Sequence, residues 1–242
     1  MPAVPPISVI IPTRNEALNI GETVCHARLQ AGFSQSPEVL VVDGGSSDRT
    51  VAAARAAGAR TLVIHGGRAA QLNAAARAAS GSILFFLHAD SRPPPAYGGH
   101  IRKTLDIPGT VAGAFRLHIA SDRFGIRLVQ CLANIRASIF QLPYGDQGLF
   151  LTRRNFDAVG GYPELPFMDD YAMSRKLARH GRVRIANSAV VTSGRRWETL
   201  GVFRTTVINQ LIIIGYNLGI PVPSLQAWYY GAFTRALSSR GN

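Results

Sequence analysis

The sequence of 242 residues predicts an α/β fold in which a mostly parallel central sheet is flanked by helices. One observation behind this prediction is that short apolar runs alternate with helix-like stretches in the first third of the chain. Strands that alternate with helices form parallel sheets covered on both faces. A second observation is that 47% of the residues are hydrophobic, enough at this length to fill one core. We therefore expect a single domain over residues 1–242.

The nucleotide-binding half, at about 1–92, is predicted to contain four strands and three helices. The strands correspond to apolar runs at 7–11, 39–42, 61–64 and 83–87. The helices correspond to stretches at 15–31, 47–57 and 68–79. Thr13 and Glu16 have the spacing of a capping box, so Glu16 has a structural role available at the start of the first helix.

The rest of the chain is predicted to form an acceptor and catalytic half at about 93–200 and a C-terminal helical extension at about 201–242. Strands are expected at 114–119, 147–151 and 183–191, and helices are expected to begin near 124, 152 and 170.

The helix expected near residue 124 is amphipathic and basic. One side carries Phe124, Leu128, Cys131, Leu132, Ile135 and Ile139, and the other carries Arg123, Arg127, Gln130 and Asn134. This pattern is typical of a helix on an anionic membrane and equally of an ordinary surface helix in a basic protein.

The formal net charge of +12 comes almost entirely from arginine, because Lys103 and Lys176 are the only lysines. Arginine suits phosphate oxygens, but a solvated basic surface explains the charge equally well. Cys25 and Cys131 have no pairing or metal spacing, so we expect reduced core residues. Polar residues interrupt the apolar stretch 202–220 and no signal peptide is recognisable, which predicts a cytoplasmic protein.

Polar residues end three of the predicted strands, at Thr13, Asp43 and Asp90. Three such strand ends on one sheet predict a ligand site. A dinucleotide-binding dehydrogenase needs a glycine-rich turn after its first strand, but no glycine occurs between Pro12 and Gly21. The same absence counts against a sugar nucleotidyltransferase.

Five segments occur in sequence order between residue 7 and about 200. They are Val9-Ile10-Ile11-Pro12-Thr13-Arg14-Asn15-Glu16, Asp43-Gly44-Gly45-Ser46-Ser47-Asp48, Gly67-Arg68, His88-Ala89-Asp90 and Met168-Asp169-Asp170. Together they resemble the family 2 inverting nucleotide-sugar glycosyltransferases, which have the GT-A fold. The resemblance implies sugar transfer from a nucleotide-diphosphate donor, usually a UDP-sugar, to an acceptor hydroxyl. It also implies a divalent cation, Mn²⁺ or Mg²⁺, that offsets the charge of the departing diphosphate.

On the donor side, the resemblance implies that Asp90 is the metal ligand. His88 replaces the first acid of the family's D-x-D triplet, so it either ligates the metal, contacts the ribose or has a structural role. Asp43 is expected to accept a hydrogen bond from uracil, with a turn-forming role as the alternative. Arg68 is expected to reach the base or the diphosphate.

The lip of the base and ribose pocket is expected to include Pro12, Thr13 and Glu16, although the capping box remains a competing role for Glu16.

On the acceptor side, the resemblance implies that Asp170 is the general base and Asp169 its neighbour. Acids also favour the first turn of a helix, so one of the two has a capping role as its alternative. Asp146 and Gln147 are expected to bind acceptor hydroxyls or, alternatively, to form a tight turn. The motif end Arg196-Trp197 is expected to close the site.

The acceptor is not identified by the sequence, but the basic amphipathic helix makes a lipid-linked acceptor and peripheral contact with an anionic membrane reasonable. The alternative function is a non-catalytic binding module for nucleotides or nucleic acid. Nucleic-acid readers interleave exposed aromatic and basic residues. Here Phe85, Phe86 and Phe150 fall inside apolar strands, so we expect no nucleic-acid partner.

Overall fold

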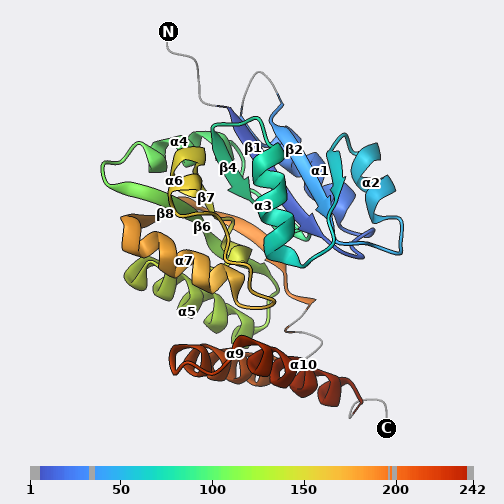
Figure 1. Ribbon diagram of the computed structural model, residues 1–242, viewed down its shortest axis with the longest axis vertical. Coiled ribbons are helices and arrows are strands. Elements are labelled where there is room, and N and C mark those ends of the chain that lie inside the picture. Colours follow the sequence, from blue (N-terminus) through green and yellow to red (C-terminus); the bar gives the residue numbers. More distant parts are fainter. Residues whose placement is uncertain (1–5, 33–35, 196, 198–200, 239–242) are drawn as a thin grey trace.

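A computed structural model describes residues 6–32, 36–195, 197 and 201–238 (Figure 1). Within these residues, eight strands form one sheet in the order β3-β2-β1-β4-β7-β6-β8-β5. The strands are β1 Ile7–Thr13, β2 Glu38–Asp43, β3 Arg60–Val63, β4 Ile83–Phe86, β5 Ser91–Arg92, β6 Thr110–Ala120, β7 Phe150–Thr152 and β8 Arg182–Ser193. The helices are α1 Ile20–Leu29, α2 Thr50–Ala56, α3 Arg68–Ala78, α4 Tyr97–Leu105, α5 Phe124–Phe140, the 3₁₀ turn η1 Gly145–Gln147, α6 Arg153–Ala158, α7 Asp169–His180, α9 Val202–Asn217 and α10 Val222–Ser238.

The sheet is mostly parallel, as the sequence predicts. Strands β1 to β4 pair in parallel, and so do β6 and β8. The short strand β7 joins these two groups, because it pairs antiparallel with both β4 and β6. Strand β5 pairs antiparallel with β8 at the edge of the sheet.

Helices cover both faces of the sheet, which explains the apolar runs in its strands. Val9, Ile10 and Ile11 of β1 are all fully buried. Because successive side chains point to opposite faces, Val9 and Ile11 pack with α1, while Ile10 packs with α3. The two core clusters therefore lie on either side of the same strands.

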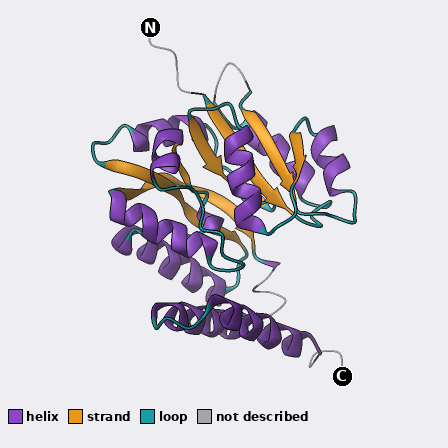
Figure 2. Cartoon of the chain, in the orientation of Figure 1, coloured by secondary structure: helices purple, strands orange, loops and turns teal. Residues whose placement is uncertain are grey.

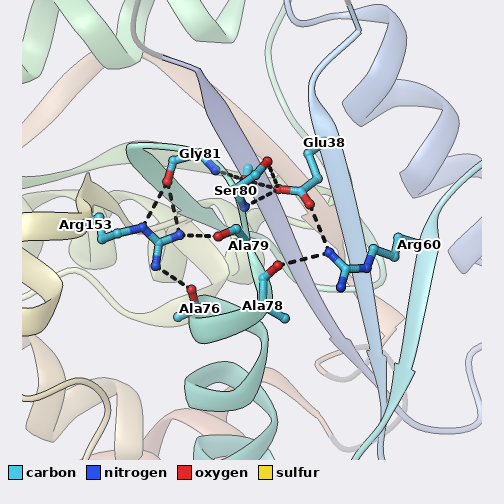
Figure 3. Close-up of polar contacts among 9 residues, drawn as sticks. Glu38, Arg60, Ala76, Ala78, Ala79, Ser80, Gly81 and Arg153 are labelled. Carbon is cyan, nitrogen blue, oxygen red and sulfur yellow. Dashed lines mark hydrogen bonds and ion pairs between the residues drawn. The ribbon is translucent and has the colours of Figure 1, made fainter.

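The connection from α3 to β4 is fixed by one arginine and one glutamate (Figure 3). The Arg153 guanidinium donates to the carbonyl oxygens of Ala76, Ala79 and Gly81 at 2.6 to 3.2 Å. The Ala76 carbonyl belongs to the last turn of α3, and those of Ala79 and Gly81 lie beyond its end, where the helix supplies no partner. On the other side, Glu38 accepts from the backbone and hydroxyl of Ser80 at 2.7 and 2.8 Å.

Several predicted boundaries differ from the structure, such as those of α2 and β6, which begin at Thr50 and Thr110 instead of residues 47 and 114. Two further differences lie near the site. Helix α1 begins at Ile20 instead of residue 15, because Asn15 has a left-handed φ of 54° and the following residues form a turn. The predicted capping box is therefore wrong, since Thr13 is the last residue of β1 and Glu16 lies in that turn. The strand expected at 147–151 is displaced: residues Gly145–Gln147 form η1 and β7 occupies Phe150–Thr152.

Helix α5 packs against the sheet with the side that carries Gln130 and Asn134 instead of its apolar side. Asn134 Oδ1 accepts from Leu117 N at 2.8 Å, and Gln130 Oε1 accepts from Ile119 N at 2.9 Å. Strand β7 pairs with β6 only near Gly113, so the β6 backbone beyond it needs other partners. The two amide side chains supply them.

The rotation of α5 leaves its apolar side exposed, including Phe124 and Ile139 at 83% and 67%. It also corrects the expectation for the cysteines, because Cys131 lies on the exposed side and Cys25 is exposed on α1.

The C-terminal helices α9 and α10 lie side by side as a separate layer at one end of the molecule (Figures 1 and 2). Ile208, Ile212, Leu225 and Tyr229 form their shared core, and Phe167 and Met168 from the loop before α7 pack against it. Among the described residues, the helices are too short or too polar to cross a bilayer.

Candidate active site

The predicted polar strand ends meet at one edge of the sheet. Thr13 at the end of β1 lies in register with Asp43 at the end of β2. Strand β4 runs parallel beside β1, and His88-Ala89-Asp90 follows it at the same edge. The expectation that these strand ends lie together is confirmed.

Asp43 is used mainly by its own turn. Its carboxylate accepts from the backbone N–H groups of Gly45 and Ser46 at 2.9 and 2.8 Å and also from the Ser46 hydroxyl. The side chain is buried, with 1% of the residue exposed. This geometry supports the turn-forming alternative, and contact with a nucleotide base stays a prediction.

The residues expected at the lip of the base and ribose pocket differ in their contacts. Glu16 accepts from Asn19 at 2.6 Å and forms an ion pair with Arg195 at 3.2 Å, which links the first loop to the end of β8. Pro12 is half-buried within β1. The buried Thr13 hydroxyl has no hydrogen-bond partner within the described structure.

Arg68 gathers the predicted catalytic residues. Its guanidinium contacts both oxygens of Asp169 at 2.9 and 3.2 Å, and it pairs with Asp170 as well. Arg68 Nη1 also lies 3.1 Å from Nε2 of His88. Asp169 and Asp170 form the first turn of α7, where the helix dipole favours negative charge. The three elements α3, α7 and the β4 strand end therefore meet at this arginine.

The pKa values of the two aspartates are shifted in opposite directions. Burial alone raises the pKa of Asp170, but the charge and hydrogen bonds of Arg68, with His88 nearby, hold the pKa below its usual range. Burial and the charge of Asp170 raise the pKa of Asp169. Asp170 is therefore ionised at neutral pH, which is the state a general base needs.

The loop before β7 closes over this cluster. A Cβ atom on Gly145 would lie 2.5 Å from Asp170 Oδ2 and 2.7 Å from His88 Nε2, so only glycine lets the loop approach so closely. The next residue, Asp146, lines the cavity, and its buried Oδ1 lacks a hydrogen-bond partner in the described structure. Burial raises its pKa, while His88 and Arg136 oppose that rise.

Gln147 lies behind the site instead of in it. The residue is fully buried, its Oε1 accepts from Tyr144 N and Arg136, and its Nε2 donates to Phe115 O. The expected contact with an acceptor is therefore corrected to a structural role. Arg136 also stacks over the Tyr144 ring at 3.4 Å, which the sequence analysis did not anticipate.

A cavity of about 440 Å³ brings together part of the predicted set, whereas Pro12, Thr13, Glu16 and Asp43 do not line it. Arg68, His88, Asp90, Asp146, Asp169, Asp170 and Trp197 line it. The C-terminal layer also supplies Ile212, Ile213 and Tyr230 to the cavity, and no sequence motif marks these residues. Because these residues read as an ordinary apolar helix pattern, only tertiary packing identifies them. Arg196 lies outside the described residues.

The cavity fits a cation held jointly with a substrate. Within the described chain, no group of three or more His, Cys, Asp or Glu residues could enclose a metal ion. Asp90 nevertheless offers a half-buried carboxylate to the cavity. Mg²⁺ and similar ions are often bound by one or two carboxylates together with substrate phosphates. The donor set therefore suits a divalent cation bound with a diphosphate.

A larger trough of about 680 Å³ lies near the start of β8 and contains none of the predicted site residues. The cavity at the strand ends is therefore the better candidate for an active site.

Residues 8–162 match the model of the family described as glycosyl transferase family 2. The mannosyltransferase PcManGT from Pyrobaculum calidifontis, solved with GDP-Man and Mn²⁺, is 22% identical with a TM-score of 0.67, covering 99% of this chain and 76% of that chain. Glucosyl-3-phosphoglycerate synthase from Mycobacterium tuberculosis, solved with Mn²⁺, UDP and phosphoglyceric acid, is 20% identical with a TM-score of 0.58, covering 90% and 80%. A comparison with curated proteins gave no match. Since the family model covers more than half of the chain, the protein belongs to glycosyl transferase family 2 and is a glycosyltransferase with the GT-A fold.

Proposed function

We propose that the protein transfers a sugar from a UDP-sugar to an acceptor hydroxyl with inversion, in a single displacement with Asp170 as general base. One observation carries the proposal: Asp90 and Asp170 line the same cavity. A donor diphosphate and an acceptor hydroxyl can then be bound together, with the charge-neutralising group and the base both in reach.

On the donor side, Asp90 would hold Mn²⁺ or Mg²⁺ together with the diphosphate. The cation supplies positive charge that stabilises the departing nucleoside diphosphate. Solved relatives contain Mn²⁺ or Mg²⁺ with UDP, which supports this choice. His88 contacts Arg68 and lies near Asp170, which favours a role beside the base over a role as second metal ligand.

On the acceptor side, the ionised Asp170 would remove the proton from the attacking hydroxyl. Arg68 and Asp169 keep this carboxylate in position. Asp146 also lines the cavity, which suits a hydrogen bond between its carboxyl group and an acceptor hydroxyl. Trp197 would contribute the apolar wall that closes the site.

The apolar wall of the cavity, with Ile212 and Ile213, also supports a lipid-linked acceptor. Contact with an anionic membrane and a cytoplasmic location stay predictions, and sugar transfer requires neither of them.

The test measures nucleotide release from UDP-, GDP- and dTDP-sugars with and without Mn²⁺. We expect Asp90→Ala to lose the Mn²⁺-dependent rise in melting temperature that a bound donor causes. Asp170→Ala should retain that rise but lose about 10² to 10⁴-fold in transfer rate. The exposed Asp157 lies outside the cavity, so Asp157→Ala is the matched control and should behave as the wild type.

Equal transfer rates in all four proteins would defeat the assignment of the site. Nucleotide binding without release by the wild type would favour the non-catalytic binding module instead.

A further inference from the structure

Helices α5 and α9 each expose an apolar stripe with the same spacing. On α5 the stripe consists of Phe124, Leu128, Leu132, Ile135 and Ile139. On α9 it consists of Phe203, Val207, Leu211 and Ile214, and it continues to Leu218 directly after the helix. Both stripes advance by four, four, three and four residues, which keeps each on one face of its helix. Phe124 and Phe203 are each 83% exposed. We call these ten residues the apolar surface.

The two stripes begin close together. A Cβ atom on Gly125 would lie 3.3 Å from Cγ1 of Val202, so the first turns of α5 and α9 are in contact. Phe124 directly precedes Gly125 in the chain, and Phe203 directly follows Val202. Soluble monomeric proteins rarely expose extended apolar surface without a binding role.

The two helices that carry the apolar surface contain positive charge only, and Asp122 directly precedes Arg123 before α5. Residues 123–145 and 201–242 contain no aspartate or glutamate. The arginines in these segments are Arg123, Arg127, Arg136, Arg204, Arg235 and Arg240. Arg123 and Arg127 are exposed beside the start of the α5 stripe, and Arg204 is exposed beside Phe203. Apolar residues flanked by arginine match the interface of an anionic bilayer, where the ring enters the acyl boundary and guanidinium groups meet phosphates.

A second copy of the chain fits this surface less well than a bilayer does. A symmetric pairing would bring the same arginine-bearing helices of two copies together, and like-charge contacts weaken association.

The apolar surface is also close to the cavity. Helix α9 exposes Leu211 and Ile214 on one side and lines the cavity with Ile212 and Ile213 on another. A helix is about 10 Å across, so the cavity and the apolar surface are separated by roughly one helix.

We propose that the apolar surface rests on an anionic lipid bilayer and brings the cavity beside an acceptor held in that bilayer. The docking itself stands alone, whereas its role in acceptor delivery rests on the proposed function. Because the described helices do not span a bilayer, the contact is peripheral.

The experiment is flotation of the whole protein with phosphatidylcholine vesicles, with and without phosphatidylglycerol, at low and high salt. We expect the wild type to float with the anionic vesicles at low salt. Phe124→Ser with Phe203→Ser, and separately Arg123→Gln with Arg127→Gln, should each reduce the bound fraction about tenfold.

Matched controls make equivalent apolar-to-serine and arginine-to-glutamine changes elsewhere. Leu18→Ser with Leu29→Ser changes two residues that are 92% and 81% exposed near α1. Arg77→Gln with Arg179→Gln removes the same charge from exposed positions on α3 and α7. Both controls should float as the wild type does, and thermal unfolding of every variant verifies that it is folded.

Absence of wild-type flotation, or equal flotation by the surface variants and the wild type, overturns the inference. The inference is also overturned if the wild type has the mass of a dimer in solution and does not bind vesicles, and if Phe124→Ser with Phe203→Ser abolishes that dimer. Thermal shift with UDP and Mn²⁺ separates the two proposals. A protein that binds UDP but not vesicles refutes the docking alone, and one that binds vesicles but releases no nucleotide refutes the proposed function alone.

Discussion

The two ends of the central sheet are built on opposite electrostatic principles. At the end where β4 begins, Arg153 and Glu38 satisfy backbone groups with hydrogen bonds of 3.2 Å or less (Figure 3). At the other end, Asp146, Asp169 and Asp170 share one cavity with His88 and Arg68. The first end pairs each charge with partners of opposite polarity. The second collects like charges and leaves one carboxylate oxygen, Asp146 Oδ1, without a partner in the described structure.

This difference separates stability from function within one sheet. Buried groups without partners cost free energy, and they persist where chemistry requires them. We therefore expect substitutions at the Arg153 end to destabilise the fold with little effect on the site. Substitutions at the cavity should impair transfer and leave the fold intact or more stable.

The largest effect on stability is expected for Arg153→Ala. Four hydrogen bonds from the guanidinium to carbonyl oxygens would be lost, which should lower the free energy of unfolding by about 2 to 4 kcal/mol. Thermal unfolding measures this change. The neighbouring Arg154 is exposed, so Arg154→Ala is the control and should leave the melting temperature almost unchanged. Equal melting temperatures for both variants would show that the contacts of Arg153 contribute little.

A smaller, pH-dependent effect is expected for Glu38→Gln. Burial alone raises the pKa of Glu38, but hydrogen bonds from Ser8 and Ser80 and the charge of Arg60 outweigh it and hold the pKa below its usual range. A lowered folded-state pKa gives stability that is present above the unfolded-state pKa and is lost as pH falls through the folded-state pKa. The wild type should therefore melt at a higher temperature than the variant at neutral pH, and the difference should shrink in acid. A constant difference across this range would contradict the assignment.

The smallest effect on stability, with opposite sign, is expected for Asp146→Asn. Burial raises the pKa of Asp146, so its ionised form opposes folding at neutral pH, and this cost disappears below the unfolded-state pKa. The variant should melt about 2 to 4 °C higher than the wild type at neutral pH, with convergence in acid. Transfer should nevertheless fall, because the attacking hydroxyl loses the carboxyl group of Asp146 as its hydrogen-bond partner. A variant that is less stable and fully active would reverse the comparison between the two ends.

The sequence predicted the first half of the fold well because its signals are local. Strands such as β1 are buried on both faces, so an unbroken apolar run identifies them. Parallel pairing then carries Thr13 and Asp43 to one edge without further information.

The orientation of α5 could not be predicted in the same way. Gln130 and Asn134 face the sheet because β7 is too short to pair with all of β6. The orientation of α5 therefore depends on the length of β7, which the sequence of α5 does not contain. The turn-forming contacts of Asp43 and the burial of Gln147 likewise depend on which backbone groups lie nearby. Residue type and spacing identify chemistry, but they do not show which groups the fold itself uses.

The side-chain amides of Gln130 and Asn134, which bind the β6 backbone in place of a neighbouring strand, link hydrogen exchange in β6 to the detachment of α5. Asn134 binds both the N–H and the C=O of Leu117, so α5 continues the ladder of β6 with side-chain groups. The N–H of Leu117 cannot exchange with deuterium from solvent until this helix detaches. Hydrogen exchange at that single site therefore reports the docking equilibrium of the whole helix, including the apolar stripe on its outer side.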